Sequence, residues 1–272
     1  MDLEATYGVL ATEGGAVLRW DAGSRKIDQF RDPPLSLPRK DAFAAFSPKG
    51  DLAATATLAE DAKNNENYNR VWDIERDRLW PLEGAHAIAS LEFSLDGTRV
   101  LAASEAAKDK KRLATVWDAR TGKKTVELKH DGVVLSAHFS RDGLRIATTS
   151  LDFYRAHVWD AVTGNEIQVL DGHTYDVKSA RFSPDGGRVV TASSDRSVRV
   201  WDVQTGTQIL QFEIGIEAND AFFSEDGGHI FVVTEEGEIL TYDVAWTRRL
   251  DRDLRVRVCK EKLSGIDNGS CS

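Results

Sequence analysis

This chain of 272 residues has only two cysteines, no long apolar run and no excess of positive charge. Its two cysteines, Cys259 and Cys271, lie close to the C-terminus and could not cross-link the body before them. This excludes a disulfide scaffold and fits a reducing compartment. No apolar run approaches the ~20 residues of a membrane-spanning helix, and the first residues lack the features of a signal peptide. We therefore expect a cytoplasmic protein that does not enter a membrane.

The net charge of -9, from 44 acidic and 35 basic residues, argues against general affinity for nucleic acids or anionic membranes. Motifs of common enzymes are missing as well. The six histidines show no HExxH pattern and no zinc-site spacing with cysteine. The segment TGKKT (121–125) ends like a phosphate-binding loop but lacks the upstream glycine. We expect no enzyme activity, no metal and no cofactor.

Two short motifs recur along the chain with nearly the same period. Phe-Ser-x-x-Gly begins at Phe46, Phe93, Phe139, Phe182 and Phe223, at spacings of 47, 46, 43 and 41 residues. Trp-Asp begins at Trp20, Trp72, Trp117, Trp159 and Trp201, and Tyr242-Asp243 forms a sixth, altered copy. Two independent motifs in register indicate an internal structural repeat.

Each repeat contains four short segments with the composition of strands. One segment ends at Phe-Ser, and the glycine after it supplies the positive φ of a tight hairpin turn. A second segment is rich in β-branched residues, as in RVVTAS (188–193), and a third ends at Trp-Asp. A Thr-Gly turn then leads to a fourth segment such as QILQFE (208–213). We name these four segments strands a, b, c and d.

Four short antiparallel strands in about 40–45 residues are typical of a β-propeller blade. The motifs resemble those of the WD-repeat β-propeller family over about residues 3–250. This resemblance implies an all-β fold of about six four-stranded blades in residues 1–250, with a first blade that is incomplete. Residues 251–272 would form a separate tail.

The resemblance also implies a buried hydrogen-bonded set of His, Ser or Thr, Asp and Trp. One repeat matches this set with His173, Ser193, Asp195 and Trp201. The preceding repeat matches it with His130, Ser150, Asp152 and Trp159, with one extra residue between Asp and Trp. We expect Asp195 to accept from His173, and His173 to reach Ser193 and the Trp201 indole. The role of such a set is structural, because it stabilises only if every member is satisfied.

The first repeat contains strands b, c and d at 7–12, 15–21 and 26–30, but no strand a. Rings of this family usually close by sharing one blade between the two chain ends. Two alternatives therefore stay open: a strained six-blade ring, or the C-terminal piece of a longer propeller. The stretch DLRVRV (253–258) could supply the missing strand, but its surroundings also have helical spacing. The tail resembles the short helix after propellers in bacterial STAND-type and TIR-associated proteins, which implies a signalling role.

In this family, partners commonly bind the face that carries the d–a loops and the b–c turns. One repeat places Tyr175, Asp176, Lys178, Ser194 and Arg196 on that face. The preceding repeat places Leu135, Phe153 and Tyr154 there. Aromatic and arginine side chains supply much of the binding energy at interfaces, and Phe153-Tyr154 is the foremost candidate. Packing of these two rings against the next blade is the alternative.

We expect a non-enzymatic platform that binds a protein partner or another domain of a longer parent chain. Two segments, 57–70 and the basic 105–112, are long where other repeats have short b–c turns. Long insertions in repeat arrays often form binding surface. The alternative function is therefore a ligand- or nucleic-acid-sensing module that uses residues 105–112.

Overall fold

The structure, a computed structural model, describes residues 7–11, 17–21, 26–30, 42–57, 69–85, 88–104, 113–151 and 153–245. Its regular structure consists of short strands, β1 to β22, arranged in six antiparallel sheets. The strands follow one another in each sheet in chain order, as expected for consecutive hairpins. The expected all-β class is confirmed.

The first three sheets contain the following strands: β1 (Tyr7–Ala11), β2 (Val17–Asp21) and β3 (Lys26–Phe30); β4 (Ala42–Phe46), β5 (Leu52–Thr57), β6 (Arg70–Asp73) and β7 (Arg78–Pro81); β8 (Ile88–Phe93), β9 (Arg99–Ser104), β10 (Leu113–Asp118) and β11 (Lys124–Lys129).

The last three sheets contain the following strands: β12 (Val134–Phe139), β13 (Arg145–Ser150), β14 (Ala156–Asp160) and β15 (Glu166–Leu170); β16 (Val177–Phe182), β17 (Arg188–Ser193), β18 (Ser197–Asp202) and β19 (Gln208–Glu213); β20 (Ala218–Phe223), β21 (His229–Thr234) and β22 (Ile239–Asp243).

The turn between strands a and b explains the repeated Phe-Ser-x-Asp-Gly motif. In the fifth sheet the Ser183 hydroxyl donates to Asp185 Oδ1 at 2.5 Å, and Gly186 has φ of 68°. The Asp185 carboxylate also accepts from the Gly187 amide at 3.1 Å. A side chain at position 186 would be strained at this φ, so the glycine is required for the tight turn. The motif therefore builds hairpins.

The hydrophobic core lies between neighbouring sheets. One cluster joins Leu101 and Val116 to Ile146 and Trp159, and another joins Val158 and Leu170 to Val189. These residues are fully or almost fully buried. The third, fourth and fifth sheets thus bury both faces against their neighbours, which is the physical reason why the unit is repeated.

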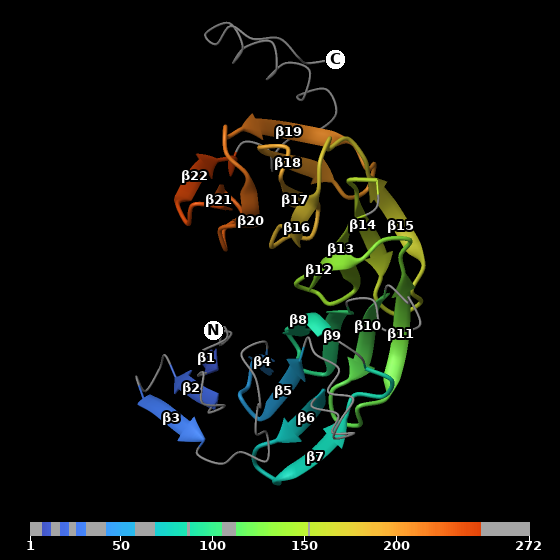
Figure 1. The fold of residues 1–272 in the computed structure, drawn as a ribbon, viewed down its shortest axis with the longest axis vertical. Coiled ribbons are helices and arrows are strands. Elements are labelled where there is room, and N and C mark those ends of the chain that lie inside the picture. The colour runs from blue at the N-terminus through green and yellow to red at the C-terminus, as the bar shows by residue number, and fades with distance from the viewer. Residues whose placement is uncertain are drawn as a thin grey trace, which may run out of the picture.

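Figure 1 shows the sheets in chain order around a common centre, as an open arc with β1–β3 at one end and β20–β22 at the other. Within the described residues the first sheet has three strands, which correspond to the predicted strands b, c and d. Within the described residues the last sheet has three strands, and the residues after 245, where a strand d would follow β22, lie outside them. The stretch 253–258 and the tail 251–272 lie outside the described residues.

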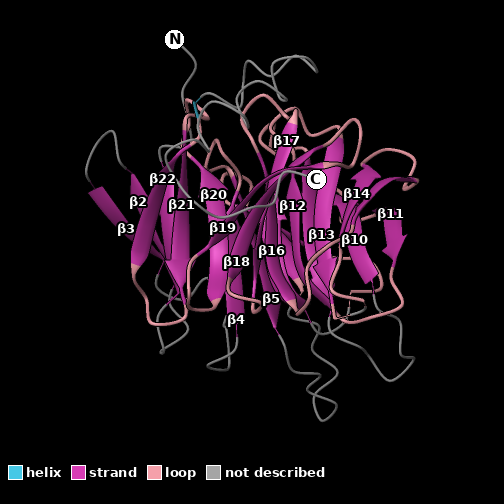
Figure 2. Ribbon diagram, turned by 90° about the horizontal axis from the view of Figure 1, so that it is seen from above, coloured by secondary structure: helices cyan, strands magenta, loops and turns pink. Residues whose placement is uncertain are grey.

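The strands run between two faces of the arc, visible from the side in Figure 2. The a–b and c–d turns lie on one face. The b–c turns and d–a loops lie on the other, which we call the bc face. This follows from the antiparallel order of each sheet. Phe153 and Tyr154 therefore lie on the bc face, and Val162, in a c–d turn, on the opposite one.

Candidate functional site

A chain of hydrogen bonds in the fifth sheet joins Asp195, His173, Thr191 and Trp201. His173 Nδ1 lies 2.7 Å from Asp195 Oδ2, and His173 Nε2 lies 2.7 Å from the Thr191 hydroxyl. The Trp201 indole N–H donates to the same hydroxyl at 2.9 Å. Thr191 can then donate its own proton to Nε2, which places the imidazole proton on Nδ1, facing Asp195.

The expected role of Ser193 in this chain was therefore wrong, and Thr191 takes it. Both residues point to the same side of β17, because side chains in a strand alternate with a period of two. The register decides between them, since Trp201 lies opposite Val189 whereas Val177 and Ser193 pair near the turn. Ser193 is four residues from the Trp201 level, about 13 Å along the strand. The indole cannot reach that far.

Burial and hydrogen bonding have opposite effects on the pKa values of His173 and Asp195. Burial lowers the pKa of His173, although the hydrogen bond that it donates to Asp195 acts to raise it. Burial raises the pKa of Asp195, but the hydrogen bonds from His173 and Ser197 outweigh this effect and hold it below its ordinary value. A neutral imidazole and an ionised carboxylate are thus the stable pair.

The fourth sheet repeats the His, Thr and Trp part of this arrangement. The Thr148 hydroxyl lies 3.1 Å from His130 Nε2 and accepts from the Trp159 indole at 2.7 Å. The prediction that Ser150 takes this position was wrong, because Trp159 lies opposite Ile146, four residues from Ser150. The buried hydroxyl of Ser150 has no hydrogen-bond partner. Burial beside His157 lowers the pKa of His130 to about 3. Asp152 lies outside the described residues.

Ser193, Ser194 and Asp195 of the fifth sheet also position the loop that carries Tyr175 on the bc face. The Ser193 hydroxyl donates to the Tyr175 carbonyl at 3.1 Å, and the Thr174 amide donates to Asp195 Oδ2 at 3.1 Å. The Ser194 amide donates to the Asp176 carbonyl at 2.9 Å. The loop that carries Tyr175 is therefore fixed to the b–c turn by three bonds, and Ser193 acts in loop placement.

Aromatic side chains from two sheets meet on this face. The rings of Tyr154 and Tyr175 stack with centroids 5.6 Å apart and an angle of 4° between their planes. Phe153 is 69% exposed, Tyr175 54% and Tyr154 39%, and Leu151 beside them is also exposed. We call these four residues the aromatic face. Packing against the next blade accounts for part of Tyr154, but not for the exposure of Phe153.

The backbone under the aromatic face is in an unfavourable conformation. Phe153 and Tyr154 have φ of 52° and 57°, in the left-handed region that side chains with a Cβ rarely adopt. Tyr154 is equivalent to Arg196 (φ 66°) in the fifth sheet and to Gly237 (φ 82°) in the last. Glycine would be the low-energy choice at these positions. Two consecutive strained aromatic residues at a turn point to a function of their side chains.

Charged neighbours hold the aromatic face in place. The Arg155 guanidinium lies 5.5 Å from the centre of the Phe153 ring and forms an ion pair of 2.7 Å with Asp171. Asp171 belongs to the loop that leads to Tyr175, so the pair also links this loop to the b–c turn of the fourth sheet. A cation over an aromatic face contributes roughly 0.5–1 kcal/mol at an exposed site.

Most of the other predicted partner-binding residues are less exposed than Phe153 and Tyr175. Asp176, Ser194, Lys178 and Leu135 are half-buried, and Arg196 is exposed. Leu135 and Lys178 occupy the bulged position of β12 and β16, where the pairing register shifts. The structure thus brings Tyr154 and Tyr175 into contact and leaves these residues around them.

Sequence reasoning missed a chain of charges on strands a. Glu92 Oε2 lies 2.5 Å from His138 Nδ1, and Arg181 forms two bonds of 3.0 and 2.9 Å with the Asp220 carboxylate. Arg181 Nη1 also lies 3.5 Å from His138 Nδ1. Glu92, His138 and Arg181 all precede the repeated Phe, which is the signal that could have revealed them. The chain connects four consecutive sheets.

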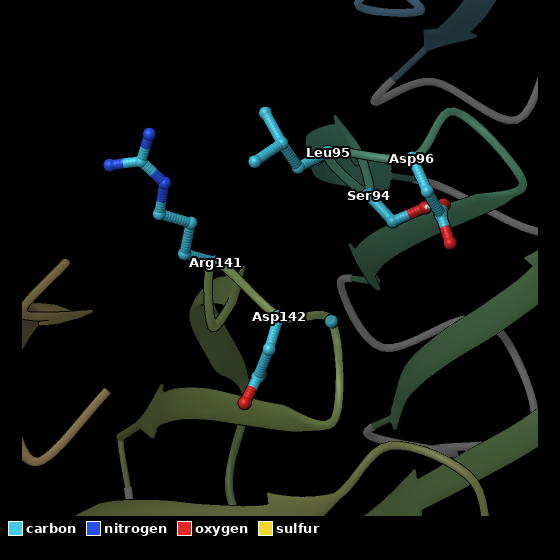
Figure 3. A pocket seen from close by; sticks show the side chains of 6 residues that line it. Ser94, Leu95, Asp96, Arg141 and Asp142 are labelled. Atoms are coloured by element: carbon cyan, nitrogen blue, oxygen red, sulfur yellow. Dashed lines mark hydrogen bonds between the residues drawn. The ribbon is translucent and has the colours of Figure 1, made fainter. Parts of the chain in front are cut away.

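A cavity of about 260 Å³ lies between two neighbouring a–b turns, on the face opposite to the aromatic face. Figure 3 shows Ser94, Leu95 and Asp96 of one turn across from Arg141 and Asp142 of the next. The Asp96 and Asp142 carboxylates accept from serine hydroxyls in their own turns at 2.6 Å. These acids are therefore used in turn formation, which leaves little polar capacity for a ligand.

Within the residues that the structure describes, no group of three or more His, Cys, Asp or Glu side chains is placed to hold a metal. In the same part of the chain, no helix has the length and hydropathy needed to cross a membrane. The basic segment 105–112 and most of segment 57–70 lie outside the described residues.

Comparison with known proteins identifies the repeat. Residues 164–202 match the family model described as WD domain, G-beta repeat. The comparisons support the WD-repeat family. The matched residues include Asp195 and Trp201 of the hydrogen-bonded chain and Arg196 of the bc face. The arc of antiparallel sheets of three or four strands is consistent with a WD-repeat β-propeller.

Several WD-repeat relatives resemble longer parts of this chain. A serine-threonine kinase receptor-associated protein of Dictyostelium discoideum is 34% identical over 134 residues, which are 48% of this chain and 43% of that protein. A guanine nucleotide-binding protein subunit beta of Solanum tuberosum is 26% identical over 254 residues, 86% of this chain and 64% of that protein. An Aspergillus terreus eukaryotic translation initiation factor 3 subunit I is 30% identical over 122 residues, 43% and 36% respectively.

The chain spans less than two thirds of the length of each of these three relatives. The relatives are eukaryotic proteins, so they do not support the bacterial signalling context that the tail resemblance implies. Together with the matched repeat, they support a chain built from WD repeats.

Proposed function

We propose that this protein is a docking platform that binds a protein partner through the aromatic face. The single observation that carries the proposal is the exposed, strained pair Phe153-Tyr154, stacked through Tyr154 on Tyr175 of the next sheet. Rigid, exposed aromatic side chains supply large contact area at low entropic cost and are enriched among interface hot spots.

The names of the relatives agree with such a role. One relative is named as receptor-associated and two are named as subunits of larger proteins. The proposed partner is accordingly another protein, or another domain of a longer parent chain. We propose the cytoplasm as its location, in line with the scarcity of cysteine. The bacterial signalling role is the weaker proposal, since it rests on the tail alone.

Site-specific photo-crosslinking tests this function. A benzophenone amino acid is placed at position 153 in the full chain, and at position 162 in a matched control. Val162 is 68% exposed, almost the same as Phe153, but lies on the opposite face. We expect position 153 to capture a discrete protein in cells that position 162 does not. Equal capture from both positions would contradict a docking role of the aromatic face.

A further inference from the structure

The last sheet differs from the complete sheets at its outer edge. In β10, β14 and β18 most residues of strand c are buried, whereas β22 alternates between exposed and half-buried residues. Ile239 is 67% exposed, although the equivalent Val198, also three residues before the aromatic residue of the Trp-Asp motif, is 0% exposed. Within the described residues β22 is paired on one side only. β22 therefore has the apolar residues of a strand that is paired on both sides, but among the described residues it lies at the edge of its sheet.

Strand d shows what would cover this edge. In the complete sheets the residue opposite the Ile239 position is large and apolar: Leu128 opposite Ala114, Leu170 opposite Ala156 and Phe212 opposite Val198. Leu128 and Leu170 are fully buried. Phe212, which lies beside the last sheet and packs on Tyr242 with ring centroids 4.5 Å apart, is only half-buried. The uncovered apolar patch thus extends from β22 onto β19.

Within the described residues, the charged side chains that flank β22 itself are acidic. Glu235, Glu236, Glu238 and Asp243 flank β22 and are exposed, and within the described part of the chain no ion pair joins them to a cation. A second copy of the same edge would place these carboxylates against one another, which disfavours a dimer through β22. A strand with basic side chains would instead be attracted to it.

We propose that the edge of β22 binds an extended, basic segment of a partner protein, which adds to the last sheet as an antiparallel fourth strand. Main-chain hydrogen bonds to β22 supply affinity, and alternate side chains supply specificity. By analogy with Leu210 opposite Val200 and Phe212 opposite Val198, the segment has apolar residues opposite Thr241 and Ile239. In the partner segment, a lysine or arginine lies between these two apolar residues, and another follows them. This surface is separate from the aromatic face and does not depend on the proposed function.

The probe is a labelled octapeptide with the sequence of residues 207–214, in which Gln211 and Glu213 are replaced by lysine. The unchanged sequence serves as the control peptide. Fluorescence anisotropy measures binding to the full chain, and hydrogen exchange follows the amides of Ile239–Asp243. We expect the lysine peptide to bind at least about fivefold more tightly than the control peptide, and to slow exchange in β22.

Two variants test the contacts. Ile239→Asp is expected to weaken binding by about tenfold or more, because it removes the apolar contact and adds an anion inside the patch. The matched control is Ile167→Asp on β15, an exposed apolar residue of a complete sheet, which leaves affinity within about twofold. Glu238→Lys is expected to lower the affinity for the lysine peptide but not for the control peptide.

Three results would overturn the proposal. The first is no binding of the lysine peptide, and the second is binding without protection of β22. The third is an increase in affinity upon Arg255→Glu and Arg257→Glu, because residues 253–258 alternate apolar and basic side chains and would then be the occupant. Phe153→Ala with Tyr154→Ala is expected to leave peptide binding unchanged, so failure here and failure of the aromatic face can be told apart.

Discussion

Tyr154 and Tyr175 lie with their rings parallel and 5.6 Å apart, although they belong to different sheets. Tyr154 comes from the turn between β13 and β14, and Tyr175 from the loop before β16. Ser193 fixes the carbonyl of Tyr175, and Asp195 fixes the amide of Thr174. The residues of the repeated unit therefore act indirectly. They hold the backbone of the loop that presents the aromatic face.

The stacked pair predicts a coupling between the two sheets. Tyr154→Ala and Tyr175→Ala, singly and together, form a double-mutant cycle in urea unfolding. We expect a coupling energy of roughly 0.5–1 kcal/mol, because stacked aromatic pairs contribute about that much beyond burial. A matched cycle with Tyr154→Ala and Val162→Ala, on opposite faces, should be additive. A coupling near zero for the tyrosine pair would mean that the stack does not form in solution.

The corrected hydrogen-bonded chain predicts a ranking of two substitutions. Thr191→Val keeps the shape of the side chain but leaves the Trp201 indole and His173 Nε2 without their shared partner. We expect a loss of about 2–4 kcal/mol in the free energy of unfolding, since each orphaned buried group costs about 1–3 kcal/mol. Ser193→Ala removes the bond to the Tyr175 carbonyl and the bond from the Asp195 amide, and should cost about 1–2 kcal/mol, less than Thr191→Val. Urea unfolding checks the ranking, and the reverse order would restore the first assignment.

The same residues show what the sequence could and could not reveal. The fold class follows from spacing, because Phe-Ser-x-x-Gly and Trp-Asp keep one period over five copies. Spacing cannot decide whether Thr191 or Ser193 bonds Trp201, because both side chains point to the same side of β17. Only the pairing register of β17 and β18 shows that Thr191 is the one near Trp201. The same holds for Thr148 and Ser150 in β13.

The surface was predictable only in part. Two aromatic residues at an unusually long turn were visible as Phe153-Tyr154, but their left-handed backbone and the stack on Tyr175 depend on how two sheets meet. The charge chain from Glu92 to Asp220 likewise spans residues that are far apart in sequence. The open edge of β22 was missed because Ile239 and Val198 look alike in sequence and differ only in what covers them.

Acid is expected to destabilise the protein through His130. Its pKa falls from 6.5 in the unfolded chain to about 3 in the folded protein. The unfolded state therefore binds more protons between these pH values, so stability is fully present above about pH 6.5 and declines as the pH falls towards 3. The lowered pKa of Asp195 acts in the same direction at the acid end of this range.

Urea unfolding at several pH values measures this effect. We expect the wild type to lose a few kcal/mol between pH 6.5 and pH 4, at about 1.4 kcal/mol per pH unit for one proton. His130→Gln should show a shallower slope over the same range, whatever its stability at neutral pH. Equal slopes in both proteins would show that another group controls the acid response.

Salt dependence separates protein docking from nucleic-acid sensing by residues 105–112. If that basic segment bound nucleic acid, affinity for an oligonucleotide would fall steeply with salt and would weaken in a Lys108→Ala, Lys110→Ala, Lys111→Ala variant. We expect only weak, non-specific oligonucleotide binding at physiological salt, with little effect of these substitutions. Tight binding with a steep, lysine-dependent salt slope would favour the sensing function.

The most direct test of the docking role is the affinity of the captured partner for three forms of the full chain, measured by calorimetry. We predict that Phe153→Ala with Tyr154→Ala weakens binding by about 100-fold, as expected for two hot-spot residues. Val162→Ala, the control on the opposite face, should bind within about twofold of the wild type. Wild-type affinity in the double variant, with its melting temperature unchanged, would contradict the aromatic face as the docking site.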